Sequence, residues 1–308
     1  MPVEVYIVEW EVCYLIFLIF KISKRKEQSS VQKASTQKGD AMGHYLEIND
    51  NEAQHLAWIH SNKFTIPELF KKKFYPEGTY RNACYVLSKY VKKGFLLFEK
   101  ENMFAHNFYF LTIKAIRTLD ETGRMIVMGR KHTIRINPYE RQHDLMVQEL
   151  RITLEATPTL EDIFWVSDFE MRAGITPRTK AEFLNGELES KWRVRAYERA
   201  KSMFRRTPDG YFEADFDGDR RAFVLEFERT AYNWNMVKRM VYNLDDAFPH
   251  AQRLVVSETV PHARRMIRNL QAWVREKDLS CWFVTDFQKL TNQPFEKCWY
   301  QISHPLEE

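Results

Sequence analysis

The first half of the chain shows three successive helical patterns of apolar residues. Apolar side chains recur every three or four positions, and this spacing predicts helices over residues 51–61, 64–74 and 79–92. Asp50 is well suited to cap the first helix. Gly94 is well placed to end the third, because glycine readily adopts the backbone conformation that follows a helix.

A short β-ribbon follows these helices. Residues 95–99 and 107–112 alternate apolar and polar side chains around a polar turn, which predicts two strands, and residues 113–119 return to helical spacing. Three helices followed by such a ribbon, in this order, resemble a winged helix-turn-helix. We therefore expect that fold over residues 42–119.

The second half mixes helix and strand patterns. The patterns predict, in order, helix 143–156, strand 163–166, strands 211–216 and 222–228, helix 231–244, strand 253–256, helix 261–276 and strand 281–285. This order is typical of a mixed α/β domain, which we expect over residues 120–308.

The first 41 residues differ in composition from the rest. The apolar stretch 6–22 contains two glutamates, so only residues 12–20 are uncharged, which is too short to span a bilayer. Its acidic start also argues against a signal peptide. We expect residues 1–41 to be a dispensable extension or linker, with true initiation at Met42; the alternatives are a small packing helix and a membrane anchor. The protein is then cytoplasmic and has no membrane partner.

Composition narrows the class of protein. The 308 residues are 44% hydrophobic and 29% charged, with 10 Gly and 11 Pro, which excludes wholesale disorder, collagen and coiled coil. The four cysteines lie far apart without a CxxC pair, which argues against a zinc site and a disulfide framework. No GxxxxGK[ST], GxGxxG, HExxH or GxSxG motif occurs, so nucleotide cradles, zincins and hydrolase elbows lack sequence support.

The net charge of +4 is concentrated in the first domain, where residues 42–117 contain eleven basic and seven acidic side chains. We therefore expect double-stranded DNA as the partner, with the outer face of the third helix in the major groove and a lysine run against phosphates. The alternative is a solvated face on a protein-binding module. The expected DNA-binding residues are Thr79, Tyr80, Arg81, Tyr85 and Lys89 on the helix, and Lys71, Lys72 and Lys73 in the run.

The dipeptide Asp217-Gly218 is a strong signal for a hairpin. If the loop has two residues, it is a type I′ turn and Phe216 pairs with Asp219. A four-residue loop shifts the pairing of the strands by two positions. The register of this hairpin decides which acidic side chains meet.

Three carboxylates converge in either register. With the two-residue loop, Asp209 falls opposite Glu226, with Cβ atoms about 5 Å apart. With the longer loop, Asp209 faces Glu228. Glu228 shares the face of Glu226 because side chains alternate along a strand. Such carboxylate oxygens are the ligands of Mg²⁺ or Mn²⁺.

The opposite face of the second strand is apolar. Phe223, Leu225 and Phe227 alternate with the acidic positions, so the hairpin has one buried side and one acidic side. The simpler alternative is that the acidic side is a solvent-exposed strand surface. Its carboxylates would then pair with Arg206, Arg221 and Arg229.

Pro208-Asp209 followed by Glu226-Phe227-Glu228 resembles the PD-(D/E)xK nuclease pattern, in which Asp and an acidic-x-Lys pair lie on neighbouring strands. Glu228 stands at the family's Lys position. The resemblance implies a restriction-endonuclease-like α/β fold, with Lys238 on the following helix as the replacement lysine and Glu149 as the family's first glutamate. A solvated helix lysine is the alternative for Lys238.

A closer resemblance extends from about Leu56 to Val256. Besides the winged helix, the chain contains HDL at 143–145, TPDG at 207–210, LEFERT at 225–230 and a helix with Lys238 and Tyr242. Together these resemble the plasmid replication-relaxation proteins of bacterial mobile elements, which implies a DNA-processing protein of that origin. For His143 the residues alone favour a histidine that packs the helix, because no metal partner lies at ligand spacing.

Functions from two classes follow from these features. In a metal-dependent DNA nuclease, Asp209 and Glu226 bind Mg²⁺ or Mn²⁺, Glu228 orients water or a second metal, and Lys238 adds positive charge near the scissile phosphate. In a non-catalytic DNA-binding regulator, the nuclease-like domain serves partner binding or forms a homodimer. A third interpretation, a membrane-tethered regulator, depends on residues 6–22 alone.

Overall fold

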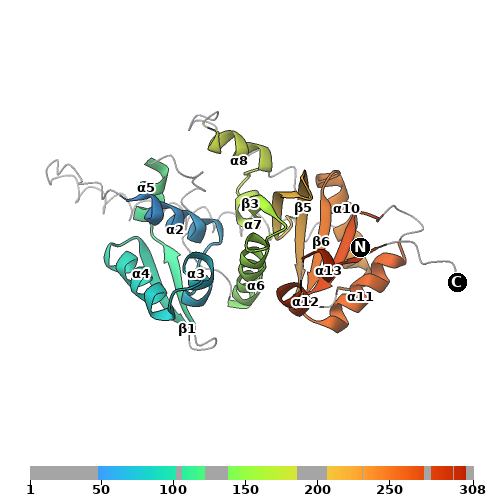
Figure 1. The fold of residues 1–308 in the computed structure, drawn as a ribbon, viewed down its shortest axis with the longest axis horizontal. Coiled ribbons are helices and arrows are strands. Elements are labelled where there is room, and N and C mark those ends of the chain that lie inside the picture. The colour runs from blue at the N-terminus through green and yellow to red at the C-terminus, as the bar shows by residue number, and fades with distance from the viewer. Residues whose placement is uncertain are drawn as a thin grey trace, which may run out of the picture. The chain divides into compact units, whose positions relative to one another are not determined.

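We describe a computed structural model of the chain, which divides into two compact units, residues 1–47 and 48–308. All described elements belong to the second unit (Figure 1). The structure describes residues 48–101, 106–121, 138–185, 207–230, 232–273, 279–293 and 295–302. The expected extension at residues 1–41 and Arg206 lie outside these ranges.

The first part of this unit contains the expected three helices and ribbon. Its elements are α2 (Asp50–Ser61), α3 (Pro67–Phe74), α4 (Tyr80–Lys92), β1 (Leu96–Glu101), β2 (His106–Leu111) and α5 (Ile113–Glu121), with β1 and β2 antiparallel. Two predicted boundaries were wrong. Asn49, not Asp50, caps α2 by accepting from the Glu52 N–H, and α3 begins at Pro67, whose fixed φ suits the first turn.

Large rings fill the core of this first part. Phe64, Phe70, Phe95, Phe108 and Phe110 are all fully buried, in a cluster with the inner residues of α2 and α4. Buried aromatic side chains remove more apolar surface from water than any other type. The few residues of α2 to α5 therefore suffice for a core.

The second part is built on a six-stranded sheet with the order β3-β4-β5-β6-β7-β8. The pairs β3/β4, β4/β5 and β7/β8 are antiparallel, whereas β5/β6 and β6/β7 are parallel. Its strands are β3 (Glu161–Ser167), β4 (Gly210–Phe216), β5 (Asp219–Glu228), β6 (Gln252–Ser257), β7 (Trp282–Asp286) and β8 (Tyr300–Gln301). The mixed α/β class is confirmed.

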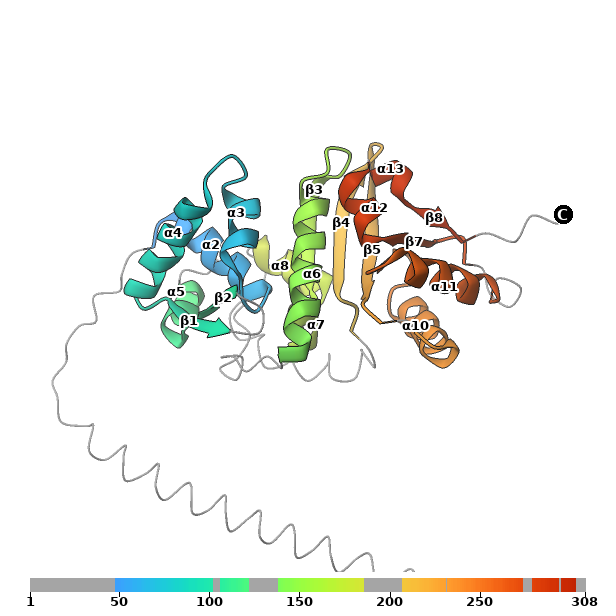
Figure 2. The ribbon, with the colours of Figure 1, turned by 90° about the horizontal axis from the view of Figure 1, so that it is seen from below.

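Helices cover both faces of this sheet. The second part contains seven described helices, of which some pack on the sheet: α6 (Pro138–Glu155), α7 (Asp168–Arg172), α8 (Pro177–Leu184), α10 (Trp234–Ala247), α11 (Val260–Gln271), α12 (Phe287–Asn292) and α13 (Phe295–Cys298). Apolar residues of α6, α12 and α13 pack on one face, and those of α10 and α11 on the other (Figure 2). Parallel neighbours such as β5 and β6 need a crossover helix, and α10 is that crossover.

Two further contacts position the site described below. Helix α6 contacts both α3 and β5, so it connects the helical part to the sheet. Among the described helices, none is both long enough and apolar enough to cross a membrane.

Candidate functional site

The hairpin β4–β5 has the predicted two-residue turn. Phe216 pairs with Asp219, and Gly210 pairs with Leu225. Asp217 and Gly218 both have positive φ, 53° and 82°, as a type I′ turn requires. One step further in the same register, Asp209 lies opposite Glu226. The Asp209 Oδ2 atom accepts a hydrogen bond of 2.7 Å from the Phe227 N–H, which fixes the carboxylate at the end of the hairpin.

The acidic side of the hairpin is buried, which corrects the solvent-face alternative. Phe223, Leu225 and Phe227 pack into the core against α6 as predicted, but Glu226 and Glu228 are only 3% and 2% exposed. The reason is the second layer of helices, α10 and α11, on that side of the sheet. The arginines named for this alternative have other described partners: Arg221 pairs with Asp219, and Arg229 donates to Gln142.

Asp209 and Glu226 line one cavity of about 520 Å³. We call it the acidic cavity, because five carboxylates and three basic side chains line it. The carboxylates come from the start of α6, from α7, from the residue before β4 and from β5. They are Glu140, Asp144, Asp168, Asp209 and Glu226, and the basic side chains are Lys63, His143 and Arg172.

Lys63 places a positive charge between two of these carboxylates. Its Nζ atom lies 2.9 Å from Asp144 Oδ1 and 2.9 Å from Asp168 Oδ2. Burial opposes the charged ammonium, but attraction to Asp168 and Asp144 outweighs it and raises the pKa of Lys63. Lys63 therefore ties the loop after α2 to α6 and α7 through charge.

His143 forms a second bridge across the cavity. Its Nε2 atom lies 3.3 Å from Asp209 Oδ2, its Nδ1 atom lies 3.7 Å from Asp144 Oδ1, and its ring packs near the ring of Phe227. Burial opposes the imidazolium, but hydrogen bonds and attraction from Asp144 and Asp209 raise the pKa of His143 to about 10. At neutral pH this side chain is a cation, so it does more than pack the helix.

Glu228 and Lys238 do not line the acidic cavity. The Glu228 carboxylate accepts from the Tyr232 N–H at 2.6 Å and from the Ser257 Oγ–H at 2.8 Å. Burial raises the pKa of Glu228. Lys238 is exposed on α10, with its Nζ atom 4.9 Å from the centre of the Trp273 ring. Of the three carboxylates and the lysine that were predicted to converge, only Asp209 and Glu226 line the cavity.

The cavity suits a hard divalent cation by donor type, since Mg²⁺ and Mn²⁺ prefer carboxylate oxygens. Asp209 Oδ2, however, already faces His143 and the Phe227 N–H. In the described ranges, no three His, Cys, Asp or Glu side chains are grouped as a metal site. Metal binding by Asp209 and Glu226 thus stays a prediction, and it requires His143 to move or lose its proton.

The predicted DNA-binding helix α4 has the expected two-sided character. Ala83, Leu87 and Tyr90 are buried, and on the other side Arg81, Tyr85, Lys89 and Lys92 are exposed, with Tyr85 at 72%. We call these four residues the α4 face. Of the two remaining predicted contacts, Tyr80 is also exposed, at 47%, whereas the Thr79 hydroxyl already accepts a hydrogen bond from the Asn82 N–H as the N-cap.

The lysine run 71–73 points toward other parts of the chain. Lys71 donates to the Pro76 carbonyl at 2.7 Å, Lys72 pairs with Glu149, and Lys73 pairs with Glu155 at 2.6 Å. Phosphates would have to compete with these partners. Glu149 does not line the acidic cavity, so the structure does not support it as a member of that site.

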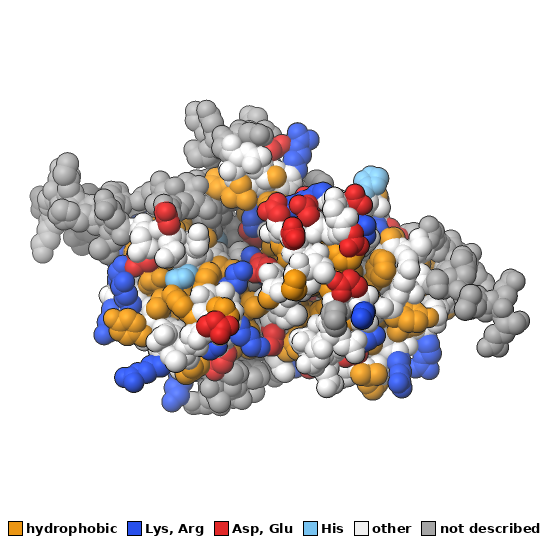
Figure 3. Space-filling model, viewed as in Figure 1, with side chains coloured by type: hydrophobic (Ala, Val, Ile, Leu, Met, Phe, Trp, Pro, Cys, Tyr) orange, Lys and Arg blue, Asp and Glu red, His pale blue; other side chains and the backbone are white. Residues whose placement is uncertain are grey.

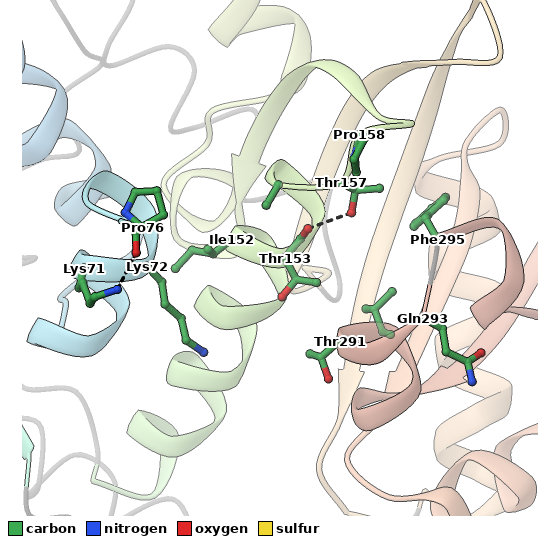
Figure 4. A pocket seen from close by; sticks show the side chains of 12 residues that line it. Lys71, Lys72, Pro76, Ile152, Thr153, Thr157, Pro158, Thr291, Gln293 and Phe295 are labelled. Carbon is green, nitrogen blue, oxygen red and sulfur yellow. Dashed lines mark hydrogen bonds between the residues drawn. The ribbon is translucent and has the colours of Figure 1, made fainter. Parts of the chain in front are cut away.

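Lys71 and Lys72 also line a second cavity, of about 450 Å³ (Figure 4). Most of its other walls are apolar or hydroxyl side chains from α6 and from the region of α12 and α13, such as Ile152, Thr153 and Phe295. Its only charged side chains are those of Lys71 and Lys72, and no carboxylate, histidine or cysteine is among its lining residues.

Sequence reasoning missed Lys63, Asp168 and the charged role of His143. The HDL motif was the only signal for His143. Nothing local marks Lys63 or Asp168, which meet across 105 positions of sequence. Comparison of the chain with protein-family models, with curated proteins and with solved structures found no match.

Proposed function

We propose that the protein binds double-stranded DNA through the α4 face. The observation that carries this proposal is the composition of α4: its exposed side presents Arg81, Lys89 and Lys92 beside Tyr85, and the helix contains no acidic residue. A helix of this kind fits the major groove, where cations meet phosphates and polar side chains meet base edges. The resemblance of α2–α4 with β1–β2 to a winged helix supports the same role.

The β1–β2 ribbon supports this placement as the wing. Leu97 and Phe98 are exposed on β1, at 53% and 50%. Lys100 is exposed on the same strand, and the acidic Glu99 beside it is paired with Arg141 at 3.1 Å. The strand therefore offers a cation and apolar contact beside one acid, Glu99, that has a partner within the chain.

Fluorescence anisotropy with a labelled duplex tests this proposal. Arg81→Ala and Lys89→Ala should each weaken binding and reduce the slope of log K against log salt concentration by about 0.9 for each phosphate that is no longer neutralised. Arg178→Ala, on the exposed side of α8, is the matched control and should change neither quantity. If both α4 variants bind duplex like wild type, α4 is not the DNA-binding helix and a protein-binding module is favoured.

Metal-dependent cleavage of phosphodiesters is a second candidate function. It is favoured by the hairpin register, which brings Asp209 and Glu226 to one cavity on neighbouring strands, as in the PD-(D/E)xK pattern. Mg²⁺ or Mn²⁺ held by these two carboxylates would activate water and offset charge on the phosphate. The His143 Nε2 atom lies 3.3 Å from Asp209 Oδ2, so the imidazolium would compete with a metal ion for that carboxylate.

A plasmid-nicking assay with Mn²⁺ tests this second function. Asp209→Asn and Glu226→Gln should abolish nicking and any metal-dependent rise in melting temperature, because each removes one carboxylate from the cavity. Asp215→Asn, on the exposed part of the same hairpin, is the matched control and should keep both. Wild type that binds duplex but neither nicks it nor gains stability from Mn²⁺ would leave the non-catalytic regulator of a plasmid or mobile element as the proposal.

A further inference from the structure

Helices α10 and α11 present a second surface rich in rings and cations. Their inner residues, including Val237, Met240, Met266 and Leu270, are buried in the same core beneath the sheet, and the two helices contact each other. Figure 2 shows them as neighbours. We call their outer surface the α10–α11 face, and define it by Trp234, Lys238, Tyr242, Arg264 and Arg268.

The rings of this face are held in place before any ligand binds. Trp234 is 41% exposed and stacks on the buried Trp273, with ring centres 5.0 Å apart and planes at 25°. Tyr242 is 50% exposed and meets the same Trp273 edge-on at 5.9 Å. Because one inner ring supports both, the exposed rings lose little conformational freedom when a ligand stacks on them.

One cation of this face lies against the rings, and the others project from α11. Lys238 follows Trp234 and precedes Tyr242 by one helical turn each, and its Nζ atom lies 4.9 Å from the Trp273 ring centre and 6.0 Å from that of Tyr242. Helix α11 contains no acidic residue. Lys and Arg side chains project from the surface around α11 (Figure 3).

The two arginines of this face are not engaged by carboxylates within the described part of the chain. Arg264 and Arg268 are exposed and form no ion pair with another described residue. Packing on the sheet requires only the inner positions of α10 and α11. The acidic residues of α10, Asp245 and Asp246, lie in its last turn, and Asp245 pairs with Arg253. Cations predominate over the rest of the two helices, which favours an anionic ligand with flat groups.

We propose that the α10–α11 face binds single-stranded nucleic acid. Unpaired bases would stack on Trp234 and Tyr242, while phosphates would meet Lys238, Arg264 and Arg268, the combination by which single strands are held without sequence reading. A duplex is a poorer occupant, because it keeps the faces of its bases stacked inside the helix and shows only their edges in the grooves. This surface is separate from the α4 face, and the proposal does not depend on DNA binding by α4.

The test uses the full-length protein and a labelled oligothymidylate of about 15 nucleotides, the upper range for one single-strand site. Anisotropy should show binding, and tryptophan fluorescence should fall as bases stack. Trp234→Ala should weaken binding by roughly tenfold or more, whereas Trp234→Phe, which keeps a ring, should lose much less. Arg264→Ala with Arg268→Ala should reduce the salt slope by about 0.7 for each phosphate that the arginines neutralise in the wild type.

Controls separate this site from α4 and from a fold defect. Arg81→Ala should leave oligothymidylate binding unchanged, and the melting temperature of Trp234→Phe should stay at that of wild type. The proposal is overturned if oligothymidylate binding survives Trp234→Ala intact, or if it depends on Arg81 instead. Equal binding of polyglutamate, sensitive to the arginines but not to Trp234, would also overturn it and indicate an acidic protein as the occupant.

Discussion

The acidic cavity and the α4 face both gather charge, but they do so in opposite ways. In the cavity, Lys63 and His143 are largely buried and lie against Asp144, Asp168 and Asp209. On the α4 face, Arg81 and Lys89 are exposed, and the Lys89 Nζ atom lies 3.5 Å from the Glu52 carboxylate. Buried charges interact strongly with each other because water does not screen them, whereas exposed charges remain available to a ligand. We therefore expect changes in the cavity to alter stability and changes on α4 to alter binding.

The largest expected effect is that of Lys63→Met. The substitution leaves Asp144 and Asp168 buried without their shared cation, which should cost about 3 to 5 kcal/mol of unfolding free energy. Urea denaturation measures it, with Lys100→Met, an exposed lysine on β1, as the control. Adding Asp168→Asn should restore part of the loss. A Lys63→Met protein as stable as the control would show that the bridge carries no net stability.

Next in size is the pH dependence caused by His143. Its pKa in the folded protein is about 10, above the ordinary value of 6.5, so its stabilising contribution is complete below about pH 6.5 and is lost as pH rises toward 10. The contribution should be on the order of 3 kcal/mol. In His143→Gln, the unfolding free energy should fall less steeply than in wild type between about pH 7 and pH 10. Parallel profiles for the two proteins would contradict the raised pKa.

Glu228→Gln should have a smaller effect of the opposite sign. Burial raises the pKa of Glu228, so its ionised form disfavours folding as pH rises through that pKa. Glutamine keeps one oxygen for the Tyr232 N–H, its amide nitrogen can donate to the Ser257 hydroxyl oxygen, and the charge is removed. We expect a gain of about 1 kcal/mol at neutral pH and none at low pH, measured by thermal denaturation. A loss at neutral pH would mean that the two hydrogen bonds favour the carboxylate more than burial disfavours it.

The smallest effect on stability is expected on the α4 face. Arg81→Ala and Lys89→Ala should change the unfolding free energy by no more than about 0.5 kcal/mol, because both side chains are exposed and Glu52 keeps its bridge to Lys93. The same proteins should lose duplex affinity in the anisotropy assay. A variant that loses stability and affinity together would remove the contrast between the two regions.

Local sequence signals predicted most helices and strands and the turn of the β4–β5 hairpin. The 3.6-residue period identified α2, α3 and α4, because one side of each helix must pack. Asp217-Gly218 identified the hairpin, because its turn needs two residues that accept positive φ. With the two-residue turn, that hairpin places Asp209 opposite Glu226, whereas a four-residue loop would have placed it opposite Glu228. These features depend on neighbours in the chain, which the sequence displays directly.

Other features depended on what packs against an element. Strand alternation showed that Glu226 and Glu228 share a face, but it could not show that α10 and α11 cover it. The helical period of α10 did not predict which residues surround Lys238. The fold places the Lys238 ammonium against the Trp273 ring. The bridge from Lys63 to Asp168 joins residues 105 positions apart. By itself, the sequence determined the longer helices, strands β1 to β7 and the hairpin turn, because these follow from local backbone geometry. It did not predict the short elements α7, α8, α12, α13 and β8. Tertiary structure alone decided which charges are buried and which partners they meet, because burial depends on segments that are distant in the chain.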